Sequence, residues 1–583
     1  MYLPTLPEIE TSRDMINVFG GYNGNLVINS NEFADMKNMT SDYYPVISPR
    51  RKRGKVAELS NPLGLLAKDS LAYVDGTKLY YNGNEVEGIT LSTAAEMCPK
   101  HLVSMGAYIL IFPDKIYFNT ENISDYGYIE SKFESQGETT FFLAKQDGEV
   151  YTGYEISDTA PENPADGTFW VDTSESVHTL KQYSEASSMW VSVTTTYIRI
   201  ESAGIGAHFE AEDGVTISGC KYSIEESKMA EQIDFLNNTS VIQSKGENYI
   251  TIIGVIDQVY TQESPISVQR VLPEMEYIIE ANNRLWGCHY GLVNNQVVNE
   301  IYSSALGDFK NWRKYQGIST DSYAVSLGSD GAFTGAITYL GQPLFFKENC
   351  IHKIYGSMPA NYQLLTTNCR GVQKGSHKSL SIIDEIVYYK SAVDVCAYDG
   401  SLPVSVSSAI TEHYRNAVGC GINGKYYISM QKNGEYTLFV FDSKRGMWHK
   451  EDNTRFIDAV KLDTDIFYVD GNKNLMSVSG NTEHDFEWMV ETGDIGMESP
   501  DHKFISRLNI RLSKLSTSTI QIFAMYDSDG NWESKGEIST TVKNSFIVPI
   551  IPKRCDHMRL RIAGKGDAKI YSISKISEQG SDL

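Results

Sequence analysis

The sequence lacks the spacings that mark most enzyme and metal sites. It has no phosphate-loop, nucleophile-elbow or metal-ligand spacing, and its eight cysteines form no CxxC pair. Scattered cysteines in a chain of 583 residues are typical of buried thiols in a protein made in a reducing cytoplasm. From the sequence we therefore assign no catalytic residue, no cofactor and no metal ligand.

Long apolar runs and positive charge are also scarce. No segment approaches the roughly 18 apolar residues that a membrane helix needs, and residues 1–21 lack the basic start and apolar core of a signal peptide. We therefore expect no membrane-spanning segment and no secretion by that route. The 51 basic residues against 74 acidic residues give a formal net charge of −23. This charge argues against broad coverage of nucleic acid, and it would suit a crowded oligomer or a lumen that repels a polyanion.

Short apolar runs separated by glycine, aspartate and asparagine recur along the chain. Aromatic residues make up 11% of it, and such runs bounded by turn formers are typical of strands joined in hairpins. Similar units begin at Gly341, Asp384, Gly424 and Asp465, at intervals of 43, 40 and 41 residues. This period predicts an all-β fold with a β-propeller of six to eight blades, because small twisted sheets bury their faces by stacking around an axis. Unrelated β-meanders in two sandwiches are the alternative.

Two segments depart from this repeat. Residues 129–271 hold Trp170 and Trp190 among polar residues, followed by alternating apolar residues, which predicts one or two inserted β domains with mild helical character at 224–236. Residues 480–583 show the period-two alternation of an antiparallel β-sandwich. The predicted domains are an extended N-terminal arm (1–60), the first part of the propeller (61–128), the insert (129–271), the second part of the propeller (272–479) and a C-terminal β domain (480–583).

One stretch resembles a known family. It begins with the block Asn283, Arg284, Leu285, Trp286 and Gly287, and it ends with a run that contains Gly307, Asp308, Asn311 and Trp312. These two blocks, separated by a β run, resemble the signature of the nozzle proteins (tail tubular protein B) of short-tailed bacteriophages and of related virion proteins labelled stabilisation proteins. The opening FADMKNMTSDYYPVISPR and the segments 491–512 and 553–575 are similar to stretches in the same family.

The resemblance implies a β-propeller in a structural protein of the phage tail, a nozzle or tube component of the conduit for genome delivery. It also implies a homo-oligomer, expected to be a hexameric ring, that contacts other tail proteins such as the adaptor and the fibres. DNA in the lumen would be a transient contact. The protein would be made in the host cytoplasm and reside in the virion, and the insert would be the counterpart of the platform region of such nozzles.

The run Arg50, Arg51, Lys52 and Arg53 is the one strong positive cluster of this acidic chain. Two interpretations are open: a contact with DNA or with an acidic neighbouring subunit, or a solvated loop. Four charges release few counterions, so they would contribute little to DNA binding. We name these four residues as a candidate assembly contact. A second basic stretch contains Lys553, Arg554, Arg559 and Arg561.

Two other functions are open from the sequence. A receptor- or glycan-binding tail module would need exposed tryptophan and tyrosine pairs flanked by aspartate or asparagine in one shallow groove. A depolymerase or glycosidase would need two carboxyls facing each other across a sugar. The recurrent Asp-Gly pairs and the calcium-like start at 527–531 are better explained as hairpin turns, because Ile538 stands where a calcium loop needs a bidentate glutamate. We therefore predict a protein that is not an enzyme.

Overall fold

β-strands make up almost all of the regular structure. The computed structural model describes residues 11–221, 235–497, 502–538, 545–548, 551 and 553–579. Within these ranges the helical elements are four 3₁₀ turns: η1 (Ala95–Met97), η2 (Ile205–Ala207), η3 (Pro359–Asn361) and η4 (His377–Ser379). The predicted all-β class is therefore confirmed, whereas the helical character predicted at 224–236 falls almost wholly outside the described residues. No helix in the described ranges is both long enough and apolar enough to cross a membrane.

Seven four-stranded antiparallel sheets form a β-propeller. The first two blades are β6 (Pro62–Ala67), β7 (Leu71–Asp75), β8 (Lys78–Tyr81) and β9 (Asn84–Glu85); then β10 (His101–Met105), β11 (Tyr108–Phe112), β12 (Ile116–Asn119) and β13 (Tyr126–Tyr128). The third and fourth blades are β26 (Tyr277–Ala281), β27 (Arg284–Val293), β28 (Gln296–Ser303) and β29 (Tyr323–Ser326); then β30 (Phe333–Tyr339), β31 (Gln342–Lys347), β32 (Cys350–Tyr355) and β33 (Gln363–Asn368).

The remaining three blades complete the ring. The fifth and sixth are β34 (Ser381–Ile383), β35 (Ile386–Lys390), β36 (Val395–Tyr398) and β37 (Val404–Ser405); then β38 (Arg415–Ile422), β39 (Lys425–Lys432), β40 (Glu435–Asp442) and β41 (Met447–Lys450). The seventh is β42 (Phe456–Leu462), β43 (Asp465–Asp470), β44 (Asn474–Ser477) and β5 (Gly54–Glu58). Seven blades lie within the predicted range of six to eight.

A strand from the N-terminal part of the chain belongs to the last blade. β5 pairs antiparallel with β44, which places Ala57 opposite Leu475. The first strand of the last blade, β42, lies against the first strand of the first blade, β6, so the ring is closed. The prediction of an extended arm over 1–60 is therefore wrong for 54–58, because the open edge of β44 offers these residues a hydrogen-bonding partner.

The inner strands of the blades are buried on both faces, which explains the continuous apolar runs in the sequence. In β11, Ile109 and Ile111 belong to the hydrophobic cluster shared with the first blade, whereas Leu110 and Phe112 belong to the cluster shared with the third blade. Successive side chains of a strand point to opposite faces, so one run serves two blade interfaces. All four side chains are at most 6% exposed.

The chain leaves the propeller between its second and third blades to build the insert. An eight-stranded sheet in the order β14-β25-β21-β22-β23-β20-β15-β24 encloses one hydrophobic cluster. Its strands are β14 (Ser131–Glu134), β15 (Thr139–Ala144), β20 (Tyr197–Glu201), β21 (Gly214–Ser218), β22 (Thr239–Lys245), β23 (Tyr249–Ile253), β24 (Tyr260–Gln262) and β25 (Ser267–Arg270). The connection from β15 to β20 carries a four-stranded tip sheet, made of β16 (Glu155–Ser157), β17 (Phe169–Asp172), β18 (Thr179–Ser184) and β19 (Met189–Ser192).

Two five-stranded sheets form a β-sandwich. One contains β1 (Thr11–Ile16), β52 (Ala568–Gln579), β46 (Lys503–Lys514), β49 (Ser545–Val548) and β50 (Arg554–Cys555). The other contains β2 (Phe33–Lys37), β45 (Glu487–Thr492), β51 (Met558–Lys565), β47 (Thr519–Tyr526) and β48 (Glu533–Ile538). Period-two alternation places Leu508, Ile510 and Leu512 in the shared core, as the sequence pattern indicated. β1 pairs with β52 and β2 with β45, so part of the predicted arm also belongs to the sandwich.

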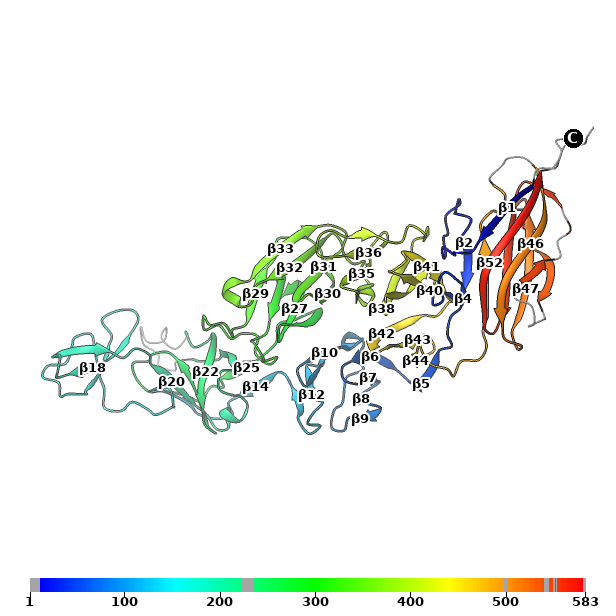
Figure 1. Cartoon of the computed structure of the whole chain (residues 1–583). Coiled ribbons are helices and arrows are strands. Elements are labelled where there is room, and N and C mark those ends of the chain that lie inside the picture. The colour runs from blue at the N-terminus through cyan, green and yellow to red at the C-terminus, as the bar shows by residue number, and fades with distance from the viewer. Residues whose placement is uncertain are drawn as a thin grey trace, which may run out of the picture.

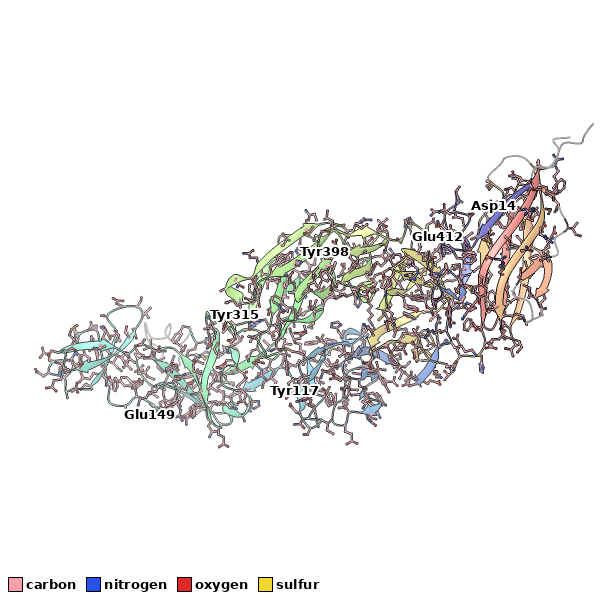
Figure 2. The ribbon with its side chains drawn as sticks, in the orientation of Figure 1. Asp14, Tyr117, Glu149, Tyr315, Tyr398 and Glu412 are labelled. Atoms are coloured by element: carbon pink, nitrogen blue, oxygen red, sulfur yellow. The ribbon has the colours of Figure 1, made fainter. Side chains whose placement is uncertain are left out.

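The molecule is elongated, and the propeller lies between the insert and the sandwich (Figure 1). The tip sheet, labelled at β18, forms the end of the molecule opposite to the sandwich (Figure 1). Figure 2 places Glu149 on the insert, Tyr117 on the propeller and Asp14 on the sandwich. The insert separates the two parts of the propeller in the sequence. The two parts nevertheless meet in space, because β10 and β26 are neighbours.

Candidate functional site: two domain joints and an axial cavity

The first signature block forms the turn into β27 and the buried start of that strand. Asn283 has a φ of 57° in the turn that follows β26. Leu285 and Trp286 are at most 2% exposed. Gly287 packs so closely on Met275 that a Cβ would lie 2.2 Å from the methionine Sδ, so a side chain at this position forces its neighbour to move. The block therefore serves packing and chain geometry.

Arg284, in the same block, holds the long connection between β28 and β29. Its guanidinium donates hydrogen bonds to the carbonyl oxygens of Ser304, Ser319 and Asp321 at 2.8, 2.7 and 2.5 Å. Arg284 is 1% exposed, and burial lowers the pKa of the guanidinium. The three carbonyl dipoles compensate the buried charge. The connection that Arg284 fixes contains the second signature block.

The second block reaches across to the insert through Asn311. The amide nitrogen of Asn311 donates to Asp213 Oδ1 at 3.0 Å and to Asp308 Oδ2 at 2.5 Å, while its oxygen accepts from the backbone N–H of Gly214 at 2.8 Å. Asn311 is 2% exposed and Asp213 is 3% exposed. Asp213 also forms an ion pair with Arg270, at the end of β25. These residues define the insert joint.

Trp312 and Gly307 shape the loop that presents Asn311. The Trp312 indole is 3% exposed and donates to the carbonyl oxygen of Phe309 at 2.9 Å, so this tryptophan is buried with its N–H satisfied. Gly307 has a φ of 72°, and its N–H donates to the carbonyl oxygen of Asn283 at 2.8 Å. This bond connects the two signature blocks. They form one structural unit, although a β run separates them in the sequence.

Further contacts fix both chain crossings at the insert joint. Lys314 Nζ lies 2.5 Å from Glu212 Oε2. Glu130, where the chain enters the insert, accepts from the backbone N–H of Leu272, where the chain returns, at 2.9 Å. Glu130 also pairs with Lys115 of the second blade at 2.7 Å. The insert is therefore attached to the propeller through polar contacts at its entry, its exit and its β21 edge.

A second joint lies between the propeller and the sandwich. Arg50 donates from both terminal nitrogens to Glu483, at 2.7 and 2.9 Å. Arg53 pairs with Glu451 at 2.5 Å and with Asp452 at 2.9 Å. The two arginines are 8% and 4% exposed. We call this cluster the sandwich joint, because it ties the segment before β5 to the connection between β41 and β42 and to the connection that leads from β44 into β45 of the sandwich.

The buried charges of the sandwich joint compensate one another. Burial alone would raise the pKa of Asp452, but the guanidinium groups of Arg53 and Arg50 hold it below the usual value. Burial likewise opposes the ionised form of Glu483, whose pKa is nevertheless lowered by its hydrogen bonds from Arg50. The Arg50 guanidinium also lies over the ring of Phe486, 4.0 Å from its centroid. Such paired, desolvated charges fix geometry more than exposed pairs do.

The predicted assembly contact required the run 50–53 to form one exposed basic patch. The structure does not show such a patch, because Arg50 and Arg53 are buried. Their partners Glu451, Asp452 and Glu483 lie about 400 residues further along the chain, where no local sequence pattern connects them. Arg51 and Lys52 keep 76% and 38% of their side chains exposed. Of the four residues, only Arg51 and Lys52 therefore remain candidates for the predicted intermolecular contact.

The second basic stretch is also used within the sandwich. Arg559 Nε lies 2.7 Å from Asp494 Oδ1, and Arg561 Nη2 lies 2.8 Å from Glu491 Oε2. The Arg561 guanidinium covers the ring of Trp532 at 3.9 Å. These two arginines are therefore committed to intramolecular ion pairs.

A cavity of about 440 Å³ lies on the propeller axis. The first strand of every blade, or the residues beside it, contributes to the wall, and most wall side chains are apolar, among them Leu66, Leu102, Ile337 and Leu380. Pockets of this size with few polar groups are typical of small-molecule sites. No sequence pattern indicates this cavity, because each blade supplies only a few of its residues.

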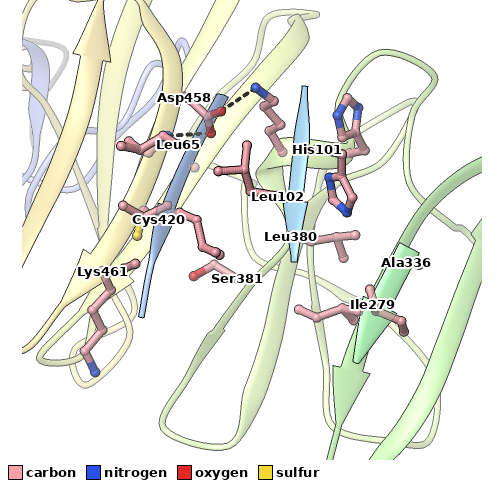
Figure 3. Close-up of a pocket in the computed structure, with 18 of the residues that line it drawn as sticks. Leu65, His101, Leu102, Ile279, Ala336, Leu380, Ser381, Cys420, Asp458 and Lys461 are labelled. Carbon is pink, nitrogen blue, oxygen red and sulfur yellow. Dashed lines mark hydrogen bonds and ion pairs between the residues drawn. The ribbon is translucent and has the colours of Figure 1, made fainter. Parts of the chain in front are cut away.

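Polar side chains gather on one side of the axial cavity. Figure 3 shows His101 and Asp458 there, and Lys378 Nζ lies 2.6 Å from Asp458 Oδ2. The ring of His101 contacts the carbonyl oxygen of Ile278 at 2.6 Å. Burial lowers the pKa of His101, and burial together with Lys378 lowers the pKa of His377 to about 4. Both imidazoles are therefore neutral at pH 7.

The axial cavity does not present the paired carboxylates of a glycosidase. Asp458 is the single carboxylate among the described residues that line it, and that residue is paired with Lys378. No group of three His, Cys, Asp or Glu residues in the described chain is arranged to hold a metal ion. At the calcium-like segment, Asp527 and Ser528 have φ values of 50° and 52° in the turn after β47. Asp527 Oδ1 accepts from the backbone N–H of Asp556 at 2.8 Å, so its carboxylate serves the turn.

The tip sheet presents an aromatic cluster at the far end of the insert. The Tyr183 and Trp190 rings are 5.4 Å apart in an edge-on contact, and Trp190 meets Trp170 at 5.3 Å. Lys181 lies over Trp170 at 5.0 Å and pairs with Asp172 at 2.7 Å. Tyr183 and Trp190 are both half-buried. The cluster therefore offers aromatic surface beside an ion pair.

No protein-family model matches the sequence, and no curated protein sequence matches it. Among solved structures, an exo-β-1,3-galactanase from Phanerochaete chrysosporium is 10% identical, with 51% of this chain and 94% of that chain covered and a TM-score of 0.20. An acylaminoacyl peptidase from Pyrococcus horikoshii is also 10% identical, with 50% and 47% covered and a TM-score of 0.23. PorZ of Porphyromonas gingivalis is 7% identical, with 83% and 70% covered and a TM-score of 0.23. These scores carry no argument about function.

Proposed function

We propose that this chain is a structural protein of a bacteriophage virion, a nozzle or tube subunit that works in a ring in the genome-delivery conduit. The observation that carries the proposal is the position of the signature residues. Asn311 and its neighbours attach the insert to the propeller, and Arg284 holds the loop that presents Asn311. The residues that carry the family resemblance thus have a mechanical role.

The elongated shape and the two joints support the same proposal. Buried ion pairs at the sandwich joint and buried hydrogen bonds at the insert joint hold three β domains in line. A closed propeller between two fixed domains transmits force with little bending, because packed interiors are only slightly compressible. A subunit of this kind can form the wall of a ring through head-to-tail contacts that close on themselves.

The distribution of charge also fits a conduit. Residues 131–270, the insert, contain 22 acidic and 8 basic residues. Like charge repels DNA phosphates, so an acidic wall disfavours adhesion of a passing genome. In this proposal the insert lines or extends the lumen, and the chain performs no covalent chemistry.

The oligomeric state of the purified protein tests the proposal. We expect mass photometry to give a single closed oligomer, six copies by the family resemblance, and negative-stain class averages to show a ring with a central channel. A purified protein that remains a monomer or forms a trimer at micromolar concentration would contradict the ring. A trimer would favour a tail adhesin instead.

The tip sheet favours a second candidate, a receptor- or glycan-binding tail module. Tyr183 and Trp190 form a half-buried aromatic pair at the end of the molecule most remote from the sandwich. Trp190 also contacts Trp170, which carries the Lys181–Asp172 ion pair over its ring. Such an aromatic pair is the arrangement expected of a saccharide platform. Binding of host surface polysaccharide that is lost in Trp190→Ala, with unchanged thermal unfolding, would support this function. Equal binding by Trp190→Ala and wild type would exclude the tip sheet as its site.

A further inference from the structure

The axial cavity carries an inference that is independent of the ring. Its wall is apolar over most of its surface, with Leu66, Ile278, Ile337 and Leu380 contributed by four different blades. An apolar cavity of this kind holds water poorly and gains stability when an apolar group fills it. Its volume of about 440 Å³ falls within the range of pockets that bury small organic ligands.

The charges of the cavity are almost fully compensated. Lys378 is paired with Asp458 at 2.6 Å. Lys100 is paired with Asp114 at 2.5 Å. These two lysines therefore add no net charge that a ligand must neutralise.

Lys461 is the exception. Its ammonium group makes no ion pair in the described part of the chain, and the residue is exposed at the edge of the cavity. Figure 3 shows Lys461 and Ser381 on the side of the cavity away from His101. A ligand that enters past Lys461 thus meets one cation and one hydroxyl first, and apolar walls beyond them.

We propose that the axial cavity binds an amphipathic organic monoanion, an unbranched alkyl carboxylate, with its carboxylate at Lys461 and Ser381 and its chain against the apolar wall. The alkyl chain gains free energy by leaving water. The carboxylate stays at the mouth, where it receives a charge-assisted hydrogen bond and remains partly hydrated. The opposite orientation is disfavoured, because it places the carboxylate beside the already neutralised Lys378–Asp458 pair and two neutral imidazoles.

Isothermal titration calorimetry with decanoate, below its aggregation concentration, tests the proposal on the full-length protein. We expect one saturable site per chain. Lys461→Met keeps the aliphatic part of the side chain and removes the charge, so we expect roughly tenfold weaker binding. Lys444→Met, at an exposed lysine in the turn between β40 and β41, is the matched control and should bind as wild type.

Two further ligands separate the parts of the proposal. Decylammonium has the same chain with the opposite charge and should bind at least tenfold more weakly than decanoate. Inorganic phosphate tests whether an anion alone suffices, and we expect no saturable binding. Equal binding of decanoate to wild type and Lys461→Met, equal binding of decylammonium, or non-saturable uptake of decanoate each overturns the proposal. A monomeric protein that binds decanoate at one site leaves this inference standing and refutes only the ring.

Discussion

The side-chain amide of Asn311 lies 3.0 Å from the carboxylate of Asp213, although the two residues are 98 positions apart in the sequence. One residue belongs to the third blade and the other to the insert, and both are almost fully buried. The bond joins two domains that also meet through the Lys314–Glu212 ion pair and at the two chain crossings. The orientation of the insert therefore depends on a small number of buried polar groups.

Replacing Asn311 with alanine should loosen the insert joint. Asp213 and the N–H of Gly214 each lose a buried partner, which costs about 1–3 kcal/mol per unsatisfied group. We expect faster hydrogen exchange at residues 212–216 and easier proteolysis between propeller and insert. The control is Asn453→Ala, at an exposed asparagine near the other joint. Unchanged exchange at 212–216 in Asn311→Ala contradicts the role of this residue.

Truncation of either signature tryptophan should destabilise the propeller. Trp286 and Trp312 are 2% and 3% exposed, and replacing a buried tryptophan with alanine costs about 3–5 kcal/mol. Thermal unfolding followed by circular dichroism should show a midpoint several degrees lower for each variant. An unfolding midpoint within one degree of wild type would contradict this prediction, because it would show that loss of the indole does not destabilise the propeller.

The repeat and the all-β class could be predicted from the sequence because each blade repeats a local pattern of apolar runs and turns. The contribution of β5 to the last blade could not, since its pairing joins Ala57 to Leu475 and depends on closure of the whole ring. The pairing of β1 with β52 and of β2 with β45 could not be predicted for the same reason. Local periodicity predicts that a strand forms, while the tertiary fold decides where it pairs.

Adjacent arginines offer a matched test of the sandwich joint. Arg50→Met removes two hydrogen bonds to Glu483, a partly buried carboxylate that keeps only the backbone N–H of Arg53, and this loss should cost about 1–3 kcal/mol. Arg51 is 76% exposed at its side chain, so Arg51→Met should change the free energy of unfolding by less than about 0.5 kcal/mol. Urea unfolding of both variants measures the difference. Equal losses in the free energy of unfolding for the two variants would show that the buried contacts of Arg50 do not stabilise the fold.

Stability should fall as the pH drops from about 6.5 towards 4. The pKa of His377 is about 4 in the folded protein because burial opposes its charged form, whereas an unfolded histidine titrates near 6.5. Between these values the unfolded state binds more protons, so the contribution is complete above pH 6.5 and is lost as the pH approaches 4. His449, whose pKa burial lowers to about 3, acts in the same direction.

Unfolding midpoints between pH 7.5 and 4.5 check this expectation. His377→Gln should show a shallower decline than wild type, because it has no imidazole to protonate. His413→Gln, at an exposed histidine, should follow the wild-type curve. If His377→Gln declines as steeply as wild type, other groups dominate the acid sensitivity.

The assembly prediction now concerns Arg51 and Lys52. A double change to glutamate should leave the fold intact, because both side chains keep substantial exposure. It should weaken ring formation at low and moderate salt if an acidic neighbour contacts this surface. Sedimentation velocity measures assembly, with Lys444→Glu as the control. A normal assembly profile of the double variant would assign these residues to a solvated surface.

The signature residues could be singled out from the sequence, but their chemistry could not. The blocks 283–287 and 304–312 are visible as motifs, whereas Asp213 and Arg270, which complete the insert joint, lie in the insert without any distinguishing pattern. The axial cavity is even harder to predict from the sequence. Its lining residues, such as Lys461, come together only when the seven blades close around the axis. Burial and ion pairing between distant segments decide these roles.

The pairing of β5 with β44 also sets an order of events during synthesis. Translation proceeds from the N-terminus, so β5 cannot pair with β44 until residues 474–477 have left the ribosome. β1 can pair only later still, because β52 is the last strand among the described residues. Nascent chains that stop early therefore lack both the closed ring of blades and the completed sandwich. In the proposed ring, this timing would keep incomplete subunits out of assembly, because only a chain translated through β52 has both its propeller and its sandwich complete.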